Sequence, residues 1–118
     1  MVTDLEEWVE EFARNVSAQT AAIARGDAKS GNRHADRYIA AVRKLKAQGD
    51  AGRDALALLL KHSDKDVSTM AAAFLLRYRT AEAKAVLEEA ARGEGLIAFE
   101  AAQVLKSWEL GVWALDPG

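Results

Sequence analysis

The 118-residue chain contains no cysteine, which excludes disulfides, thiolate catalysis and zinc sites built on cysteine. Its one proline is Pro117, so no proline interrupts a helix in the preceding sequence. The longest apolar runs, residues 55–60 and 70–76, are too short to cross a bilayer. The acidic N-terminal stretch has no apolar signal-peptide core, and we therefore expect a cytoplasmic protein without a membrane partner.

A surplus of basic residues is also missing, because 16 Lys and Arg stand against 18 Asp and Glu, for a net charge of -2. Nucleic-acid binding usually depends on a basic surplus, so this balance disfavours a nucleic-acid partner, although a local basic stripe is compatible with it. Half of the residues are apolar, and many of them are Ala, Leu and Val. The composition and length predict one all-α domain over residues 1–118.

Part of the sequence recurs at a spacing of thirty residues. Six small or apolar residues have a counterpart thirty positions later: Ala55, Leu56, Val67, Ala71, Ala72 and Leu75 correspond to Ala85, Val86, Ile97, Ala101, Ala102 and Leu105. A fixed period that contains two helical patterns is typical of an α-solenoid. We expect the alanine pairs to allow close approach of neighbouring hairpins.

Local signals predict six helices. Thr3 and Glu6 have capping-box spacing and predict a helix to about Arg25, after which Gly26 ends it and Asp27 caps the next helix. The apolar positions of the first helix form one stripe: Leu5, Val9, Phe12, Val16 and Ile23. The second helix is expected over residues 28–48, where a weak stretch at Gly31 indicates either close packing or a frayed first turn.

The four remaining helices are shorter. We expect them over residues 51–61, 64–78, 81–92 and 96–110. Ser63 is the predicted cap of the 64–78 helix and Thr80 of the 81–92 helix, and Gly111 ends the last helix. These elements predict three antiparallel hairpins: an N-terminal capping hairpin (1–49), two repeats (50–79 and 80–111) and a tail (112–118).

The second hairpin resembles a HEAT-like repeat. The residues that carry the resemblance are Leu56, Leu60, Asp64, Val67, Ala71, Ala72, Leu75 and Leu76. Most of the chain is also similar to a family of short bacterial HEAT-like domains of unknown function, including the Gly26-Asp27 turn, Asn32 and the ending Phe99, Leu105, Trp108 and Gly111. Ser68 and Thr69 stand where HEAT repeats often have a basic residue. The resemblance implies an α-solenoid of about six helices, and it gives no activity to transfer to this chain.

No catalytic, metal or nucleotide motif is complete. His34 and His62 lack the neighbours needed for the three or four ligands that zinc takes, and we expect surface or helix-end roles for both. The paired glutamates, such as Glu88 and Glu89, are interpreted as solvated because adjacent helical side chains point in different directions. Gly93-Glu94-Gly95 lacks the ending of a phosphate loop. We therefore expect no enzyme activity, metal or cofactor.

Two groups of residues are candidates for binding a partner. Arg33, Arg37 and Lys44 form a basic stripe that either contacts an acidic partner or is the solvated side of its helix, paired with the acidic first helix, and we favour the second interpretation. Arg77, at the end of the 64–78 helix, either complements the negative end of the helix dipole, which we favour, or lies at the rim of the concave face of a solenoid. Gln103 and Lys106 are expected on that concave face. Phe99 is expected in the core.

Trp108 and Trp113 lie at the end of the chain. We favour a tail that folds back over the open end of the stack, and the alternatives are a homodimer contact through the tail or insertion of Trp113 into a partner. The function expected from these observations is a protein-binding module or adaptor, of immunity type by analogy of size and charge. The alternative is a nucleic-acid-associated module that uses the basic stripe of the second helix.

Overall fold

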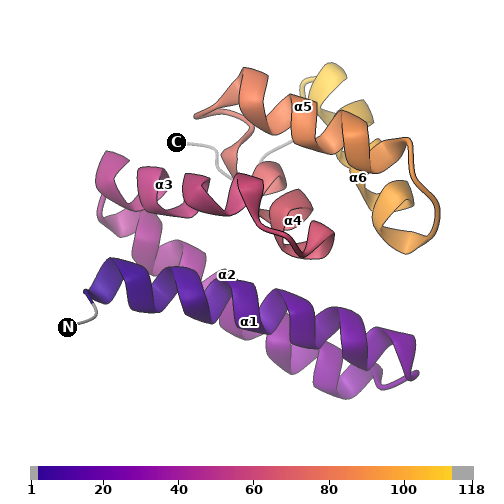
Figure 1. Ribbon diagram of the computed structural model, residues 1–118, viewed down its shortest axis with the longest axis horizontal. Coiled ribbons are helices and arrows are strands. Elements are labelled where there is room, and N and C mark those ends of the chain that lie inside the picture. The colour runs from indigo at the N-terminus through magenta and orange to yellow at the C-terminus, as the bar shows by residue number, and fades with distance from the viewer. Residues whose placement is uncertain (1–2, 113–118) are drawn as a thin grey trace. The chain divides into compact units, whose positions relative to one another are not determined.

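The computed structural model describes residues 3–112, and within these residues it contains six α-helices and no strand (Figure 1). The helices are α1 (Asp4–Ala24), α2 (Ala28–Ala47), α3 (Asp50–Ala57), α4 (Lys65–Leu75), α5 (Thr80–Ala91) and α6 (Leu96–Glu109). A 3-10 helix, η1 (Leu58–Lys61), continues the turn of α3. The predicted all-α class is confirmed. None of the described helices combines the length and apolarity that crossing a bilayer requires.

The first of two compact units, which ends at Leu59, contains α1, α2 and α3. Figure 1 shows α1 and α2 side by side as a long antiparallel hairpin, and α3 packs against both. Phe12 of α1 and Tyr38 of α2 meet edge to face in its core, with ring centroids 5.6 Å apart. Val16, Val42 and Leu45 are buried around them, whereas Ile23, expected in the same stripe, is exposed near the end of α1.

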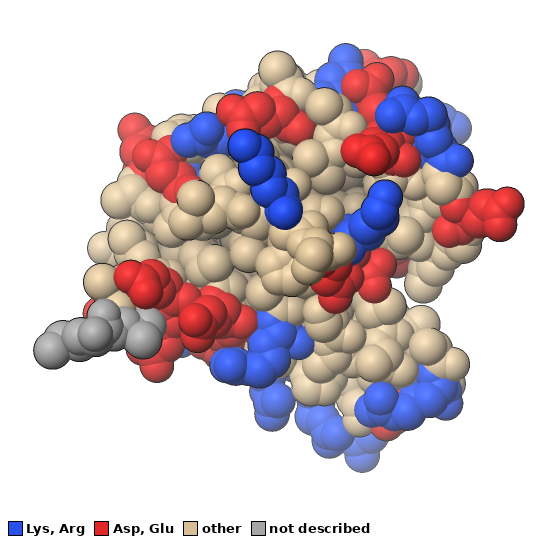
Figure 2. Space-filling view, in the orientation of Figure 1, with Lys and Arg blue, Asp and Glu red and all other residues tan. Residues whose placement is uncertain are grey.

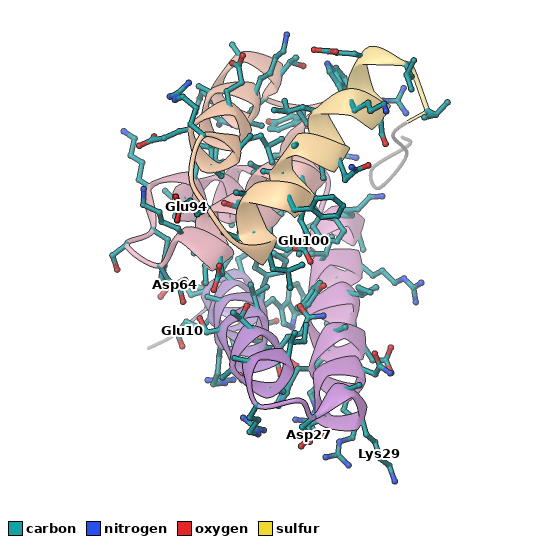
Figure 3. The ribbon with its side chains drawn as sticks, turned by 90° about the vertical axis from the view of Figure 1, so that its right-hand side faces the viewer. Glu10, Asp27, Lys29, Asp64, Glu94 and Glu100 are labelled. Carbon is teal, nitrogen blue, oxygen red and sulfur yellow. The ribbon has the colours of Figure 1, made fainter. Side chains whose placement is uncertain are left out.

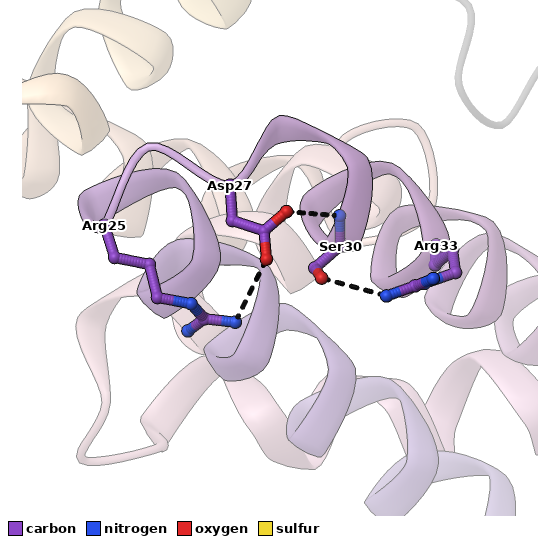
Figure 4. Close-up of polar contacts among 4 residues, drawn as sticks. All are labelled: Arg25, Asp27, Ser30 and Arg33. Carbon is purple, nitrogen blue, oxygen red and sulfur yellow. Dashed lines mark hydrogen bonds and ion pairs between the residues drawn. The ribbon is translucent and has the colours of Figure 1, made fainter.

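The ends of the first two helices follow their sequence signals. Thr3 Oγ1 accepts a hydrogen bond from the Glu6 backbone N–H at 3.2 Å, which confirms the predicted start of α1. Gly26 has a φ of 77°, a conformation that favours glycine, and ends the hairpin turn. The Asp27 carboxylate accepts from the Ser30 backbone N–H at 3.0 Å and faces Arg25 at 3.8 Å (Figure 4). The predicted cap of the second helix is therefore confirmed.

The second unit, which begins at Leu60, contains α4, α5 and α6. Helix α4 is buried over most of its surface and packs against both α5 and α6, which also pack against each other. The residues that α5 and α6 bury are Ala83, Leu87, Ala98 and Ala101. The expected pairing of α5 with α6 is present. The pairing of α3 with α4 and the stacking of hairpins into a solenoid involve both units and stay predictions.

Three local predictions in the second unit are wrong. Asp64, not Ser63, caps α4, and its Oδ1 accepts from the Asp66 backbone N–H at 2.9 Å. Helix α4 ends at Leu75 rather than Tyr78 because the N–H groups of Tyr78 and Arg79 both return to the Leu75 carbonyl. Thr80 lies inside α5 instead of capping it, and its hydroxyl donates to the Leu76 carbonyl at 2.7 Å.

The recurring alanines have different environments. Ala71, Ala72 and Ala101 are buried, but Ala102 is exposed. Ala102 lies about 100° around α6 from Ala101, on the side that its own unit does not cover. The expected close approach of neighbouring hairpins involves both units and stays a prediction.

Candidate functional site

His34 joins α1 to α2 and does not point to a metal site. Its Nδ1 lies 3.0 Å from Oδ1 of the buried Asn15, while Nδ2 of Asn15 donates to the Glu11 carbonyl at 2.8 Å. Because the Asn15 amide nitrogen is already the donor, Oδ1 is the acceptor and Nδ1 of His34 carries the proton. The histidine is therefore half of an interhelical hydrogen bond rather than a free helix-end side chain.

His62 has a local role in the turn before α4. Its Nδ1 accepts a hydrogen bond from the Asp64 backbone N–H at 3.0 Å. Across residues 3–112, no group of three or more His, Asp or Glu side chains is placed to hold a metal ion. The contacts of both histidines are thus explained by packing and turn formation.

A hollow of about 180 Å³ lies where the turn before α4 meets α5. It is lined by Leu60, Lys61, His62, Ser63, Lys65, Ser68, Thr69, Val86, Glu89 and Ala90. Lys65 Nζ and Glu89 Oε1 lie 3.9 Å apart, and both side chains are exposed. The volume is below the roughly 300–1,000 Å³ of a typical ligand pocket. Sequence reasoning did not find this hollow, because two stretches that are separate in the sequence, residues 60–69 and 86–90, form it.

Glu100 on α6 is a second feature that the sequence did not indicate. Burial raises the pKa of its carboxyl group, and the negative charge of Asp66 on α4 raises this pKa further. Figure 3 labels Glu100 on the first turns of α6. The sequence carries no signal for it, because the burial of the neighbouring Ala101 is known only from the structure.

The basic stripe of α2 is exposed. Arg33, Arg37 and Lys44 all lie on the solvent side of the helix, and Arg33 Nη2 donates to Ser30 Oγ at 2.9 Å. No ion pair joins these three cations to the carboxylates of α1 within the described part of the chain. Figure 2 shows basic side chains along the lower edge of this face, over α1 and α2, and acidic ones where α1 begins. Figure 3 shows Asp27 and Lys29 at the turn end of the hairpin.

Helix α6 exposes a row of large side chains that we name the α6 stripe. It consists of Leu96, Phe99, Gln103, Lys106 and Leu110, the C-cap residue of the helix. At about 100° per residue, the five positions fall within about 80° of one another. Leu96 is 51%, Phe99 62% and Leu110 67% exposed, and Gln103 and Lys106 are exposed between them. The buried Ala98 and Ala101 lie on the opposite side of the helix.

The placement of Phe99 corrects the prediction that it is a core residue. Its counterpart in the thirty-residue spacing, Thr69, is buried on α4, whereas Phe99 faces solvent. The thirty-residue spacing predicted the wrong environment because α4 is buried over most of its surface, whereas α6 buries chiefly one side.

The remaining candidates are distributed over the chain. Arg77 follows α4 and is exposed, and Trp108 is half-buried on α6. Trp113 and the tail beyond Val112 lie outside the described residues. Of the six candidate partner-binding residues, the structure brings Gln103 and Lys106 together on one helix face and Arg33 and Arg37 together on another. The expected concave groove stays a prediction.

Comparisons with family models, with curated proteins and with solved structures find no match to this chain. The resemblance to short HEAT-like domains therefore stays an expectation from the sequence.

Proposed function

We propose that this chain is a non-enzymatic protein-binding module and that the α6 stripe is its contact surface. The observation that carries the proposal is the row of exposed apolar side chains on a single helix face, Leu96, Phe99 and Leu110. Single exposed apolar residues are common, whereas three of them on one helix face, with the polar Gln103 and Lys106 between Phe99 and Leu110, favour an interaction surface. The row extends for about 21 Å along α6, at 1.5 Å per residue.

The chemistry of the stripe suits the recognition of another helix or of a groove. Leu96 and Phe99 are apolar anchors three residues apart, and Leu110 follows eleven residues later on the same face. Apolar anchors on one helix face are the pattern by which a helix docks on a partner. Burying one large apolar side chain stabilises a complex by about 1.5–3 kcal/mol before the costs of association are counted. Gln103 and Lys106 add polar contacts that restrict which partners fit. Such a surface serves the adaptor or immunity-type role expected from the sequence.

The test compares capture of partners by the wild-type protein and by variants. The immobilised protein is incubated with an extract of the cells that naturally make it, and the retained proteins are identified by mass spectrometry. Each retained protein is then purified, and its affinity is measured by calorimetry. We expect Phe99→Glu to weaken the affinity by a factor of at least about 10, the equivalent of 1.4 kcal/mol.

The matched control is Leu58→Glu, which changes an exposed leucine of η1 and leaves the α6 stripe intact. This variant should bind as the wild-type protein does. Equal loss of binding in both variants, or no loss with Phe99→Glu, would show that the α6 stripe is not the contact surface.

A second candidate function is nucleic-acid association through α2. It is favoured by the exposure of Arg33, Arg37 and Lys44 and by the lack of α1 ion pairs to them within the described residues. Contacts to phosphates weaken steeply with salt. Fluorescence anisotropy with duplex DNA at 50 and 200 mM salt should show salt-sensitive binding that Arg37→Glu lowers and Lys61→Glu leaves unchanged. Binding that is absent at 50 mM salt, or equally weakened by both changes, would reject this candidate.

A further inference from the structure

The hollow beside the start of α4, which we name the α4–α5 hollow, is formed by two facing helix sides and the turn before α4. Each helix contributes three residues at positions i, i+3 and i+4, so each set shares one side of its helix. The two sets are Lys65, Ser68 and Thr69 on α4 and Val86, Glu89 and Ala90 on α5. The residues of the α6 stripe, all of which the structure describes, do not line this hollow.

The hydroxyl group of Thr69 is the unexplained polar group of the hollow. Thr69 is 4% exposed, and its Oγ1 has no hydrogen-bond partner among the described residues. A helical threonine can donate to the carbonyl group four residues earlier, as Thr80 does to Leu76. For Thr69 that carbonyl belongs to Lys65, and it already accepts from the Ser68 hydroxyl at 3.2 Å. Because a buried polar group without a partner is unfavourable, Thr69 indicates an acceptor that binds in the hollow.

Hydrogen-bond donors outnumber acceptors around the hollow. Nδ1 of His62 accepts from the Asp64 backbone N–H, so in the neutral ring the proton is on Nε2, which is a donor. The other donors are the ammonium groups of Lys61 and Lys65 and the hydroxyl groups of Ser63 and Thr69. Among the residues that line the hollow, Glu89 alone has a carboxylate. This set favours a ligand whose polar atoms are acceptors.

The charge, the apolar wall and the size of the hollow define the ligand further. Two lysine ammonium groups and one carboxylate leave one positive charge, and the hollow lies beside the first turn of α4, the positive end of its helix dipole. The apolar part of the wall consists of Leu60, Val86 and Ala90. A cavity of roughly 150 Å³ holds a benzene molecule, so the volume of about 180 Å³ fits a ligand of about six to eight non-hydrogen atoms.

We infer that the α4–α5 hollow binds a small aliphatic carboxylate of about four or five carbon atoms, a function beyond the protein binding proposed for the α6 stripe. Its carboxylate accepts from the Thr69 hydroxyl and pairs with Lys65, while its alkyl chain covers Val86. Glu89 Oε1 lies 3.9 Å from Lys65 Nζ and therefore competes with the ligand for this cation. Inorganic phosphate would leave the apolar wall uncovered, and an organic cation would face the excess of ammonium groups.

A titration with sodium butyrate, followed by heteronuclear NMR at constant ionic strength, tests the inference. A ligand this small should bind with a dissociation constant on the order of 1–10 mM. Butyrate should shift the amide signals of residues 60–69 and 86–90 in a saturable way and leave those of α1 unchanged. Absence of saturable shifts up to about 50 mM would overturn the inference. Equal binding of butylammonium or of inorganic phosphate would overturn the assignment to an aliphatic carboxylate.

Two charge variants test the sign of the ligand. Lys65→Gln should weaken butyrate binding by about threefold to tenfold, and Glu89→Gln should tighten it by a similar factor because the competing carboxylate is gone. Lys29→Gln removes an exposed cation that does not line the hollow and should leave the affinity unchanged. Phe99→Glu should also bind butyrate as the wild-type protein does, which separates this site from the α6 stripe. Effects of the same sign in Lys65→Gln and Glu89→Gln would overturn the inference.

Thr69→Val tests the role of the buried hydroxyl group with little change in shape. Because this hydroxyl has no partner among the described residues, the variant should be at least as stable as the wild-type protein in urea denaturation. It should nevertheless bind butyrate about threefold to tenfold more weakly. Ser68→Ala removes a hydroxyl that already donates to the Lys65 carbonyl and should leave the affinity unchanged. Loss of stability in Thr69→Val, or butyrate binding equal to that of the wild-type protein, would overturn the placement of the carboxylate against Thr69.

Discussion

Gly52 of α3 lies so close to Leu45 of α2 that a Cβ atom at position 52 would collide with the Leu45 carbonyl group, and it would lie 3.0 Å from the Leu45 Cα. The obstacle is backbone, which cannot move aside as a flexible side chain can. Gly52 is buried within the first turn of α3, where glycine is otherwise a poor helix former. The short α3 helix can therefore approach the end of α2 only because this position lacks a side chain.

We predict that Gly52→Ala lowers the free energy of unfolding by about 3 kcal/mol, because the overlap forces α3 away from α2. Urea denaturation followed by circular dichroism measures this change. The matched control is Gly31→Ala, whose added Cβ would lie 3.5 Å from Ile23 Cγ1, an ordinary van der Waals contact. Since alanine is the better helix former, this control should raise stability by up to about 1 kcal/mol. Equal stability of the two variants would contradict the close approach.

Ala72 and Ala102 occupy corresponding places in the thirty-residue spacing but differ in burial. Ala72 is fully buried, and Ala102 is exposed. We expect Ala72→Leu to destabilise the protein by about 1–3 kcal/mol through overpacking. The same change at Ala102 should stay within about 0.5 kcal/mol of the wild-type protein. Thermal unfolding of the pair checks this, and an unchanged melting curve for Ala72→Leu would contradict the close packing around Ala72 in α4.

The Asp27 cap should make stability depend on acid pH. The backbone and side-chain hydrogen bonds of Ser30, aided by Arg25 and Arg33, hold the pKa of Asp27 below its ordinary value of 3.8. A carboxyl whose pKa is lowered by folding stabilises the protein above about pH 3.8, and this contribution is lost as the pH falls through the lower pKa of the folded state.

Asp27→Asn keeps a capping oxygen and removes the charge. We expect it to be less stable than the wild-type protein at pH 7, with the difference shrinking as the pH falls below 3.8. Urea unfolding at a series of pH values measures the difference. Asp36→Asn removes one charge from the exposed side of α2 without touching a cap and serves as the control. A difference for Asp27→Asn that is independent of pH would reject the charge contribution.

Glu100 should have the opposite effect. Burial, and then the charge of Asp66, raise the pKa of Glu100 above its ordinary value of 4.5. A carboxyl whose pKa is raised by folding favours the folded state at low pH, and this contribution is lost as the pH rises through the raised pKa. Glu100→Gln should therefore be more stable than the wild-type protein at pH 7, and this advantage should disappear below pH 4.5. Chemical denaturation with Glu88→Gln as the exposed control measures it, and a wild-type protein that is the more stable at pH 7 would contradict the prediction.

The helices themselves could be predicted because their signals are local. Thr3, Gly26 and Asp27 begin or end helices through backbone geometry and hydrogen bonds that depend on only a few neighbouring residues. Ser63 and Thr80 show where this reasoning reaches its limit. Several side chains near a helix start can cap it. Asp64 is the residue that caps α4, and the Thr80 hydroxyl donates to the Leu76 carbonyl instead of capping α5.

The sequence by itself therefore determined that the chain is helical and approximately where each helix begins and ends. The tertiary structure decided which side of each helix is buried, and with it the candidate binding surface. Helix α6 has apolar residues around most of its circumference, including Ile97, Phe99, Val104 and Leu110, so its periodicity does not select one face. Burial depends on neighbours that are remote in the sequence. Only the packing of α4 and α5 against Ala98 and Ala101 leaves Phe99 in solvent, and only the path of α3 past Leu45 requires a glycine at position 52.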